Sequence, residues 1–132
     1  MIRVLIIDDH AAIREAMMGI LEACPGITVI GEGATGEEAI RLARQLGPDV
    51  ILMDVAIPLL DGIEAIRRIT EEHPHIIIVG LSVHPGPSME FALKDAGAVV
   101  LIVKETANGP SLRYPHQALA GAETVRLKRE IR

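Results

Sequence analysis

The chain has 132 residues, of which 49% are hydrophobic, and carries a formal net charge of −5 at pH 7. These values predict one globular domain and exclude a disordered chain. The acidic balance and the scarcity of aromatic residues argue against direct nucleic-acid binding. No apolar run reaches the roughly 18 residues of a membrane span, and the N-terminus lacks a signal-peptide pattern, so we expect a cytoplasmic protein without membrane contact.

Short apolar runs alternate with stretches of helical period along the chain. The expected strands cover residues 3–7, 28–30, 50–53, 76–81 and 99–103. The expected helices have apolar residues three and four positions apart and cover residues 13–24, 39–46, 63–69 and 89–96. Continuous apolar strands are typical of a parallel sheet covered on both faces. We therefore expect a doubly wound five-stranded parallel sheet in the order 2-1-3-4-5, the flavodoxin-like (α/β)5 fold.

Local signals predict the boundaries of several helices. Thr35 and Asp61 each precede a glutamate by three positions, as the N-cap of a capping box does. Gly97 is expected to end the fourth helix, and Asn108-Gly109-Pro110 predicts a break. A last helix is expected to begin near Pro115, because proline suits the first helical turn. We assign residues 1–125 to the domain and interpret the charged residues 126–132 as the start of a linker to a further domain.

Reactive side chains follow the strands at one edge of the expected sheet. Asp8 and Asp9 follow the first strand, Asp54 ends the third, Ser82 follows the fourth and Lys104 follows the fifth. The carboxyl ends of parallel strands share an edge where ligands bind, so we expect these side chains to converge. Three close carboxylates need a counter-charge, which Mg²⁺ supplies while keeping several waters. Asp54 is placed to act as a nucleophile that forms an acyl phosphate, with Ser82 and Lys104 holding the phosphoryl oxygens.

Over about residues 1–105 this pattern resembles the receiver domain family of response regulators, the CheY-like superfamily. The motifs that carry the resemblance are Asp8-Asp9, Asp54 within residues 53–62, Leu81-Ser82, and Lys104 after Gly97-Ala98. The start of the chain, Asp8-Asp9-His10, and the turn Ser82-Val83-His84 are similar to the subgroup with helix-turn-helix output domains.

The resemblance implies that Asp54 is the phospho-acceptor of a two-component signalling system. It implies that Asp9 binds Mg²⁺ directly, Asp8 largely through water, and that the backbone carbonyl of Ala56 is another ligand. The implied donor is a phosphohistidine on a sensor histidine kinase. The implied protein is a switch that catalyses its own phosphorylation and dephosphorylation rather than an enzyme, and a receiver–receiver homodimer is a further expectation.

Some residues depart from the family pattern. Leu101 stands where receivers usually carry a switch aromatic residue, and Glu105 follows Lys104 where proline is frequent. These departures motivate an alternative, a receiver-like interaction module that works without phosphorylation. A phosphatase acting on small substrates is a weaker alternative, because Ala56 stands where such enzymes carry a second aspartate. A flavin or nucleotide carrier is weaker still, since no glycine-rich loop follows the first strand.

The histidines show no metal-ligand spacing and are interpreted mostly as surface or loop residues: His10, His73, His75, His84 and His116. His84 is the exception, because its position two residues after Ser82 allows it to flank the phosphoryl group and to tune dephosphorylation.

Overall fold

A computed structural model describes residues 1–54, 59–82, 87–102, 104–106 and 109–111. In chain order its elements are β1 (Ile2–Ile7), α1 (Ala11–Glu22), β2 (Ile27–Gly33), α2 (Gly36–Leu46), β3 (Val50–Asp54), α3 (Leu59–Glu72), β4 (Ile77–Ser82), α4 (Pro87–Ala96), β5 (Val99–Ile102), β6 (Lys104–Thr106) and β7 (Gly109–Ser111). Within this part of the chain, no helix is long and apolar enough to cross a membrane.

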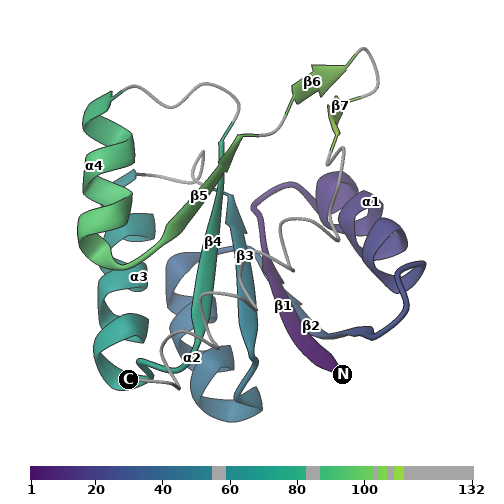
Figure 1. The fold of residues 1–132 in the computed structure, drawn as a ribbon, viewed down its shortest axis with the longest axis horizontal. Helices are drawn as coiled ribbons and strands as arrows, with labels where there is room; N and C mark the ends of the chain where they lie inside the picture. The colour runs from purple at the N-terminus through teal and green to yellow at the C-terminus, as the bar shows by residue number, and fades with distance from the viewer. Residues whose placement is uncertain (55–58, 83–86, 103, 107–108, 112–132) are drawn as a thin grey trace.

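The main sheet has five parallel strands in the order β2-β1-β3-β4-β5, which confirms the predicted topology (Figure 1). All five strands therefore end at the same edge of the sheet. β3 lies at the centre, and β1 lies between β2 and β3, with Ile7 beside Gly33 of β2 and Met53 of β3. Strand β2 is longer than predicted. It runs to Gly33 and thereby brings Glu32 to the carboxyl edge.

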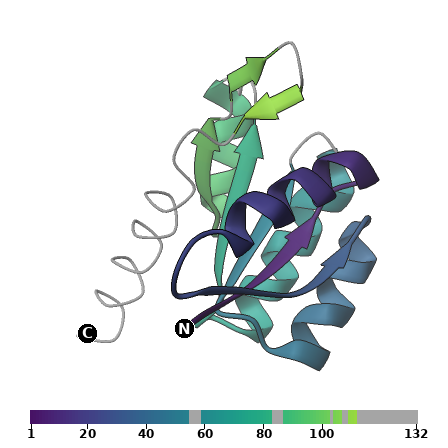
Figure 2. The same ribbon diagram turned by 90° about the vertical axis from the view of Figure 1, so that its right-hand side faces the viewer.

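Alternate residues of the strands pack against opposite layers of helices. One core cluster contains Leu5, Ile7 and the side chains of the other strands on the same face, packed against side chains of α2, α3 and α4. Val4 and Ile6 belong to the other cluster, which α1 covers through buried side chains such as Leu21. Figure 2 shows α1 on one face of the sheet and α2 and α3 on the other. Burial on both faces explains why the strands read as continuous apolar runs.

The predicted cap of α2 is confirmed, whereas that of α3 is wrong. The Thr35 hydroxyl accepts a hydrogen bond of 3.1 Å from the Glu38 amide, and the Glu38 carboxylate accepts one of 3.0 Å from the Ala34 amide. Helix α3 begins at Leu59, so Asp61 lies inside its first turn and does not precede it. Leucine has a high helix propensity, so the helix extends past the expected boundary.

Gly97 ends α4 as predicted, and it does so in a conformation that favours glycine. Its φ angle is +113°, and its amide donates a hydrogen bond of 3.0 Å to the carbonyl of Lys94. A Cβ atom built at this position would lie 2.7 Å from both Cγ2 and Oγ1 of Thr70 on α3. The absence of a side chain at Gly97 therefore allows α4 to pack closely on α3.

After β5 the chain forms a small antiparallel hairpin that the sequence analysis did not predict. β6 pairs with β7, with Lys104 beside Ser111 and Thr106 beside Gly109. The break predicted at residues 108–110 thus overlaps the start of β7. Figure 1 shows the hairpin beyond the carboxyl edge of the main sheet. The helix expected from Pro115 and the charged end at residues 126–132 lie outside the described residues.

Candidate functional site

The acidic residues of the site are placed by two neighbouring strands of the sheet, β1 and the central strand β3. β1 and β3 pair in parallel through Ile7 and Met53, and Asp8 and Asp54 are the next residue on each side. The Asp8 amide continues the ladder toward β2 by donating a hydrogen bond of 3.0 Å to the Gly33 carbonyl. The strand register therefore brings two carboxylates from distant parts of the sequence to one point on the carboxyl edge.

Asp8, Asp9 and Asp54 come together at this edge, and His10 joins them. One ligand atom from each of the four side chains lies within 4.8 Å of the others. The Asp8 side chain is buried, with 2% of its surface exposed, whereas that of Asp9 is 42% exposed. A carboxylate in a buried position needs compensation by hydrogen bonds or a cation. Three carboxylates in this spacing form a donor set that fits a hard divalent cation such as Mg²⁺.

The turn from β1 into α1 holds Asp8 through its neighbours. The backbone amide of His10 donates a hydrogen bond of 2.7 Å to Asp8 Oδ1. Arg14, on the first turn of α1, donates a bond of 2.6 Å from Nη1 to the Asp8 carbonyl. The Arg14 Nε atom lies 3.6 Å from Oε1 of Glu32 at the end of β2. Arg14 thus connects the acidic turn to α1 through the Asp8 carbonyl, and it connects α1 to the edge strand β2 through Glu32.

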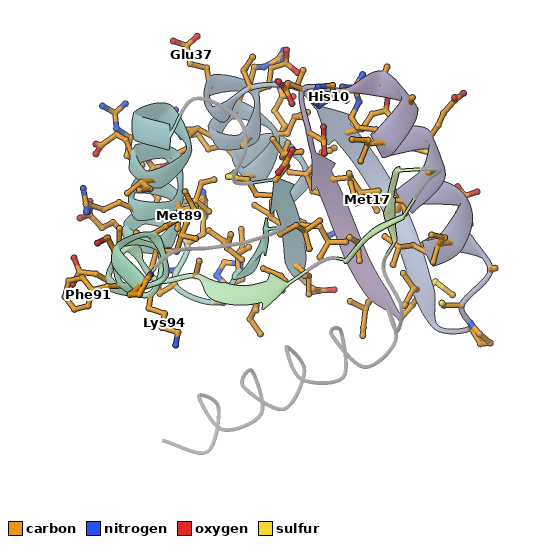
Figure 3. All side chains as sticks on the ribbon, turned by 90° about the horizontal axis from the view of Figure 1, so that it is seen from above. His10, Met17, Glu37, Met89, Phe91 and Lys94 are labelled. Carbon is orange, nitrogen blue, oxygen red and sulfur yellow. The ribbon has the colours of Figure 1, made fainter. Side chains whose placement is uncertain are left out.

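Sequence reasoning missed His10 and Arg14 as parts of this site. His10 was interpreted as a surface or loop residue, but its Nδ1 atom lies 2.9 Å from Asp9 Oδ1 and 3.4 Å from Asp8 Oδ1. Figure 3 shows His10 at the start of α1, viewed onto the end of the molecule. Its position directly after two acidic residues at a strand end was the available signal. The approach of Arg14 depends on the direction of α1, which periodicity does not give.

The remaining predicted residues are located only in part. Ser82 is the last residue of β4 and pairs with Ile102, one position beyond the pairing of Asp54 with Leu81. Its backbone therefore lies at the same edge as the carboxylates. Lys104 begins β6, two positions after β5 ends. Ala56 and His84 lie outside the described residues.

This fold and this acidic edge define a class of protein, the doubly wound α/β domains with a cluster of carboxylates at the carboxyl edge of the sheet. A family model described as the response regulator receiver domain matches residues 4–111. The chain therefore belongs to the response regulator receiver domain family, whose members are switches of two-component systems.

Individual relatives agree with this assignment. The chain is 43% identical to the transcriptional regulatory protein LiaR of Bacillus subtilis over 104 residues, which cover 79% of this chain and 49% of that protein. It is 37% identical to a protein-glutamate methylesterase/protein-glutamine glutaminase of Geobacter metallireducens over 134 residues, covering 100% of this chain and 38% of the relative. These curated relatives are thus at least twice as long as the part that the chain matches.

A solved structure supports the fold and the expected subgroup. The chain resembles a LuxR-family two-component response regulator from Aurantimonas with a TM-score of 0.77 and 29% identity, covering 96% of this chain and 86% of that one. LiaR and this regulator both favour the subgroup with helix-turn-helix output domains, as predicted. The methylesterase shows that similar receivers are also joined to other outputs.

Proposed function

We propose that Asp54 accepts a phosphoryl group from a phosphohistidine of a sensor histidine kinase, and that this switches an output. The observation that supports the proposal is the meeting of Asp54 with Asp8 and Asp9 at the carboxyl edge of the sheet. Such a cluster places a potential nucleophile beside groups that hold a counter-charge. The alternative, an interaction module that works without phosphorylation, has no finding in its favour.

Asp8, Asp9 and Asp54 would hold the Mg²⁺ ion, together with the backbone carbonyl of Ala56. When bound, the ion neutralises charge on the phosphoryl oxygens and on the carboxylates. Asp8 is the buried member and is fixed by the His10 amide, so it sets the position of the site. Asp9 is the more exposed member and lies where the site meets solvent.

The transfer itself would be an in-line displacement at phosphorus. A carboxylate oxygen of Asp54 attacks, the bond from phosphorus to the donor imidazole nitrogen breaks, and the imidazole leaves and takes up a proton. Ser82 and Lys104 would hold the phosphoryl oxygens through a hydroxyl hydrogen bond and an ammonium charge. Attack of water on phosphorus would later release inorganic phosphate and restore the Asp54 carboxylate.

The decisive experiment is intact mass after incubation with acetyl phosphate and Mg²⁺. A gain of about 80 Da, the mass of HPO₃, is expected in the wild type and not in Asp54→Asn. Asp95→Asn is the matched control, since Asp95 is an exposed aspartate on α4 and away from the cluster. No gain with acetyl phosphate or with a phosphorylated kinase, in a folded protein that binds Mg²⁺, would favour the interaction module.

We also propose that residues 1–125 form the receiver and that it works in the cytoplasm, where the kinase exposes its phosphohistidine.

We further propose that two receivers pair through α4 and β5. Phe91 supports the pairing, because 72% of its surface is exposed, and Figure 3 shows it pointing away from the sheet on α4. Light scattering at increasing concentration, with and without acetyl phosphate, tests this. Phe91→Asp is expected to lower the association, and an unchanged molar mass in the wild type would exclude the dimer.

A further inference from the structure

We propose that the hairpin of β6 and β7 is a movable element that closes on the carboxyl edge of the main sheet when Asp54 carries a phosphoryl group, and that the charge of Lys104 drives the closure. This inference rests on the proposed function, because it concerns the regulation of the same site. Closure changes the surface that a partner meets beside the phosphorylated aspartate, so the hairpin is part of the switch.

The hairpin is held mainly by its own backbone pairing. Its two strands, Lys104–Thr106 and Gly109–Ser111, have three residues each. Pro110 has no amide hydrogen and donates no bond to this short ladder. Among the elements that the structure describes, the extensive contacts of the hairpin are those between β6 and β7 themselves. An isolated two-stranded hairpin is at best marginally stable in water, so this one can move relative to the sheet at little cost in free energy.

The composition of the hairpin provides no apolar anchor. The residues of its two strands are Lys, Glu and Thr in β6 and Gly, Pro and Ser in β7, and none has a large apolar side chain. Burial of apolar surface is the main force that packs one element on another, and it cannot fix this hairpin on the sheet. The charged residues Lys104 and Glu105 are therefore the groups through which the hairpin responds to the charge of the edge.

The hairpin starts within reach of the acidic site. Figure 1 shows it beyond the carboxyl edge of the main sheet, the edge at which the acidic cluster lies. Ile102 ends β5 beside Ser82 of β4, and β4 pairs with β3, which ends at Asp54, so the ends of β5 and β3 lie two strand spacings apart, about 10 Å. Lys104 follows Ile102 by two positions, which allow about 7 Å of extended chain. A hairpin that leans across β4 therefore brings the Lys104 ammonium to a phosphoryl group on Asp54.

Phosphorylation supplies the attraction that closes the hairpin. With Mg²⁺ bound, most of the charge of the carboxylates is neutralised, and the ammonium gains little by leaving water. A phosphoryl group has a charge of about −1.5 to −2 and three acceptor oxygens, more than the single carboxylate charge that it replaces. Charge-assisted hydrogen bonds to such a group order the segment that carries the cation. Because the phosphoryl group contacts Lys104 only in the closed state, it shifts the equilibrium toward closure.

The test is amide hydrogen exchange of the full chain, measured by NMR with Mg²⁺ alone and then with Mg²⁺ and beryllofluoride, which stands in for the phosphoryl group on an aspartate. The amides of β6 and β7 are expected to exchange about fivefold more slowly, or slower still, once beryllofluoride is bound, which is the lower end of the usual coupling between two linked events. The fluorine signal of bound beryllofluoride reports independently whether Asp54 is occupied.

Two variants test whether the charge of Lys104 causes the closure. Lys104→Gln removes the ammonium and is expected to abolish the slower exchange of the hairpin amides. Glu105→Gln is the matched control, because it removes the neighbouring charge on the same strand, and the slower exchange is expected to remain. All three proteins are compared at beryllofluoride concentrations that saturate the fluorine signal, so that occupancy of the site is equal.

The inference on the hairpin is wrong if beryllofluoride occupies Asp54 and leaves the exchange of the hairpin amides unchanged; the proposed function then stands without it. It is also wrong if Lys104→Gln keeps the slower exchange at full occupancy, since closure would not depend on the ammonium. If Asp54 of the folded wild type takes neither beryllofluoride nor a phosphoryl group from acetyl phosphate or a phosphorylated kinase, the proposed function fails and the hairpin inference fails with it.

Discussion

The guanidinium of Arg14 donates a hydrogen bond of 2.6 Å to the backbone carbonyl of Asp8, across the turn that joins β1 to α1. Only 17% of the Arg14 side chain is exposed, and its Nε atom is buried without a hydrogen-bond partner among the described residues. Glu32 lies nearby, with Oε1 at 3.6 Å from Nε. Arg14 thus fixes the orientation of the peptide that precedes Asp9 and acts as a positioning residue for the acidic site.

Replacing Arg14 tests this role. Arg14→Ala is expected to lower the free energy of unfolding by about 2 kcal/mol, the usual scale for a hydrogen bond made by a charged group. It is also expected to weaken Mg²⁺ binding several-fold, because the Asp8 turn loses its support. Urea denaturation and calorimetry measure the two effects. Arg14→Lys keeps the charge without the planar fork, so partial recovery is expected; a stability loss with unchanged Mg²⁺ affinity would make Arg14 purely structural.

A side chain at Gly97 is expected to destabilise the contact between α4 and α3. Gly97→Ala introduces a Cβ atom 2.7 Å from Thr70 and places alanine at a φ angle of +113°, so a loss of about 2 kcal/mol or more is expected. Thermal or urea denaturation measures it. Gly19→Ala in the middle of α1 is the matched control, since nothing lies within 4 Å of the added atom. That variant should gain about 0.5–1 kcal/mol.

The Gly97 prediction also separates steric contact from backbone strain. Thr70→Ala removes Cγ2 and Oγ1, the two atoms nearest the new Cβ, and leaves the Thr70 Cβ atom at 3.1 Å. In the Thr70→Ala background, Gly97→Ala is therefore expected to cost less than in the wild type, with the residual cost due to the φ angle and the remaining contact with Cβ of residue 70. Equal costs in the two backgrounds would show that the contact with Thr70 contributes nothing.

The N-cap of α2 is expected to contribute measurably to stability. Thr35→Ala removes the hydroxyl that accepts the hydrogen bond from the Glu38 amide, and a loss of about 1 kcal/mol is expected. Thr35→Ser keeps the acceptor and should retain most of the stability. Urea denaturation of the three proteins provides the comparison, and equal losses in both variants would contradict a role for the hydroxyl.

An ion pair between α2 and α3 predicts a pH dependence. Arg44 donates from Nε to Glu72 Oε2 at 2.8 Å, and this hydrogen bond lowers the pKa of Glu72 below its usual value. A carboxylate with a lowered folded pKa stabilises the fold above its unfolded pKa, and this contribution is lost as the pH falls through the folded pKa. Because both groups are exposed, a small and salt-sensitive coupling is expected.

A double-mutant cycle isolates that coupling. Arg44→Ala, Glu72→Ala and the double variant are compared by urea denaturation near neutral pH and again below the folded pKa of Glu72. The coupling should be present in the first series and absent in the second. A coupling that persists in acid would show that packing of the two side chains, and not their charges, joins the helices.

Mg²⁺ is expected to stabilise the folded chain through the acidic cluster. A ligand that binds only the folded state at a hundred times its Kd adds about 2.7 kcal/mol to the free energy of unfolding. Thermal melts with and without Mg²⁺ measure this, and chelation should reverse it. Asp9→Asn should abolish most of the shift, whereas Asp95→Asn should keep it; an equal shift in both variants would place the ion elsewhere.

The fold and the acidic cluster were predictable from the sequence because both depend on periodicity. Leu5 and Val4 are adjacent in the sequence but belong to opposite core clusters. Apolar residues at consecutive strand positions indicate such a strand, which is buried on both faces. Once the strands are known to be parallel, Asp8 and Asp54 must share an edge. The roles of Ser82, Lys104 and Ala56 in holding a phosphoryl group or an ion stay predictions.

Other features depend on local geometry that periodicity does not describe. The approach of His10 to Asp9 depends on the extended φ and ψ angles of His10 at the start of α1. The sequence pattern does not show to which side of the turn this side chain points. The start of α3 at Leu59 came earlier than the capping signal at Asp61 suggested, because helix formers precede that signal. The hairpin of β6 and β7 is built from strands of three residues, too short for an alternating pattern to be recognised.

The pairing of β1 with β3 joins segments that are separated in the sequence by α1, β2 and α2. Contacts of this kind form late, because a long loop must first be closed. Asp8 and Asp54 therefore meet where β1 and β3 pair with Ile7 beside Met53. A slip of one residue would turn the Asp54 side chain to the opposite face. During folding, high-affinity binding of a divalent cation should appear together with the correct strand register and report on it.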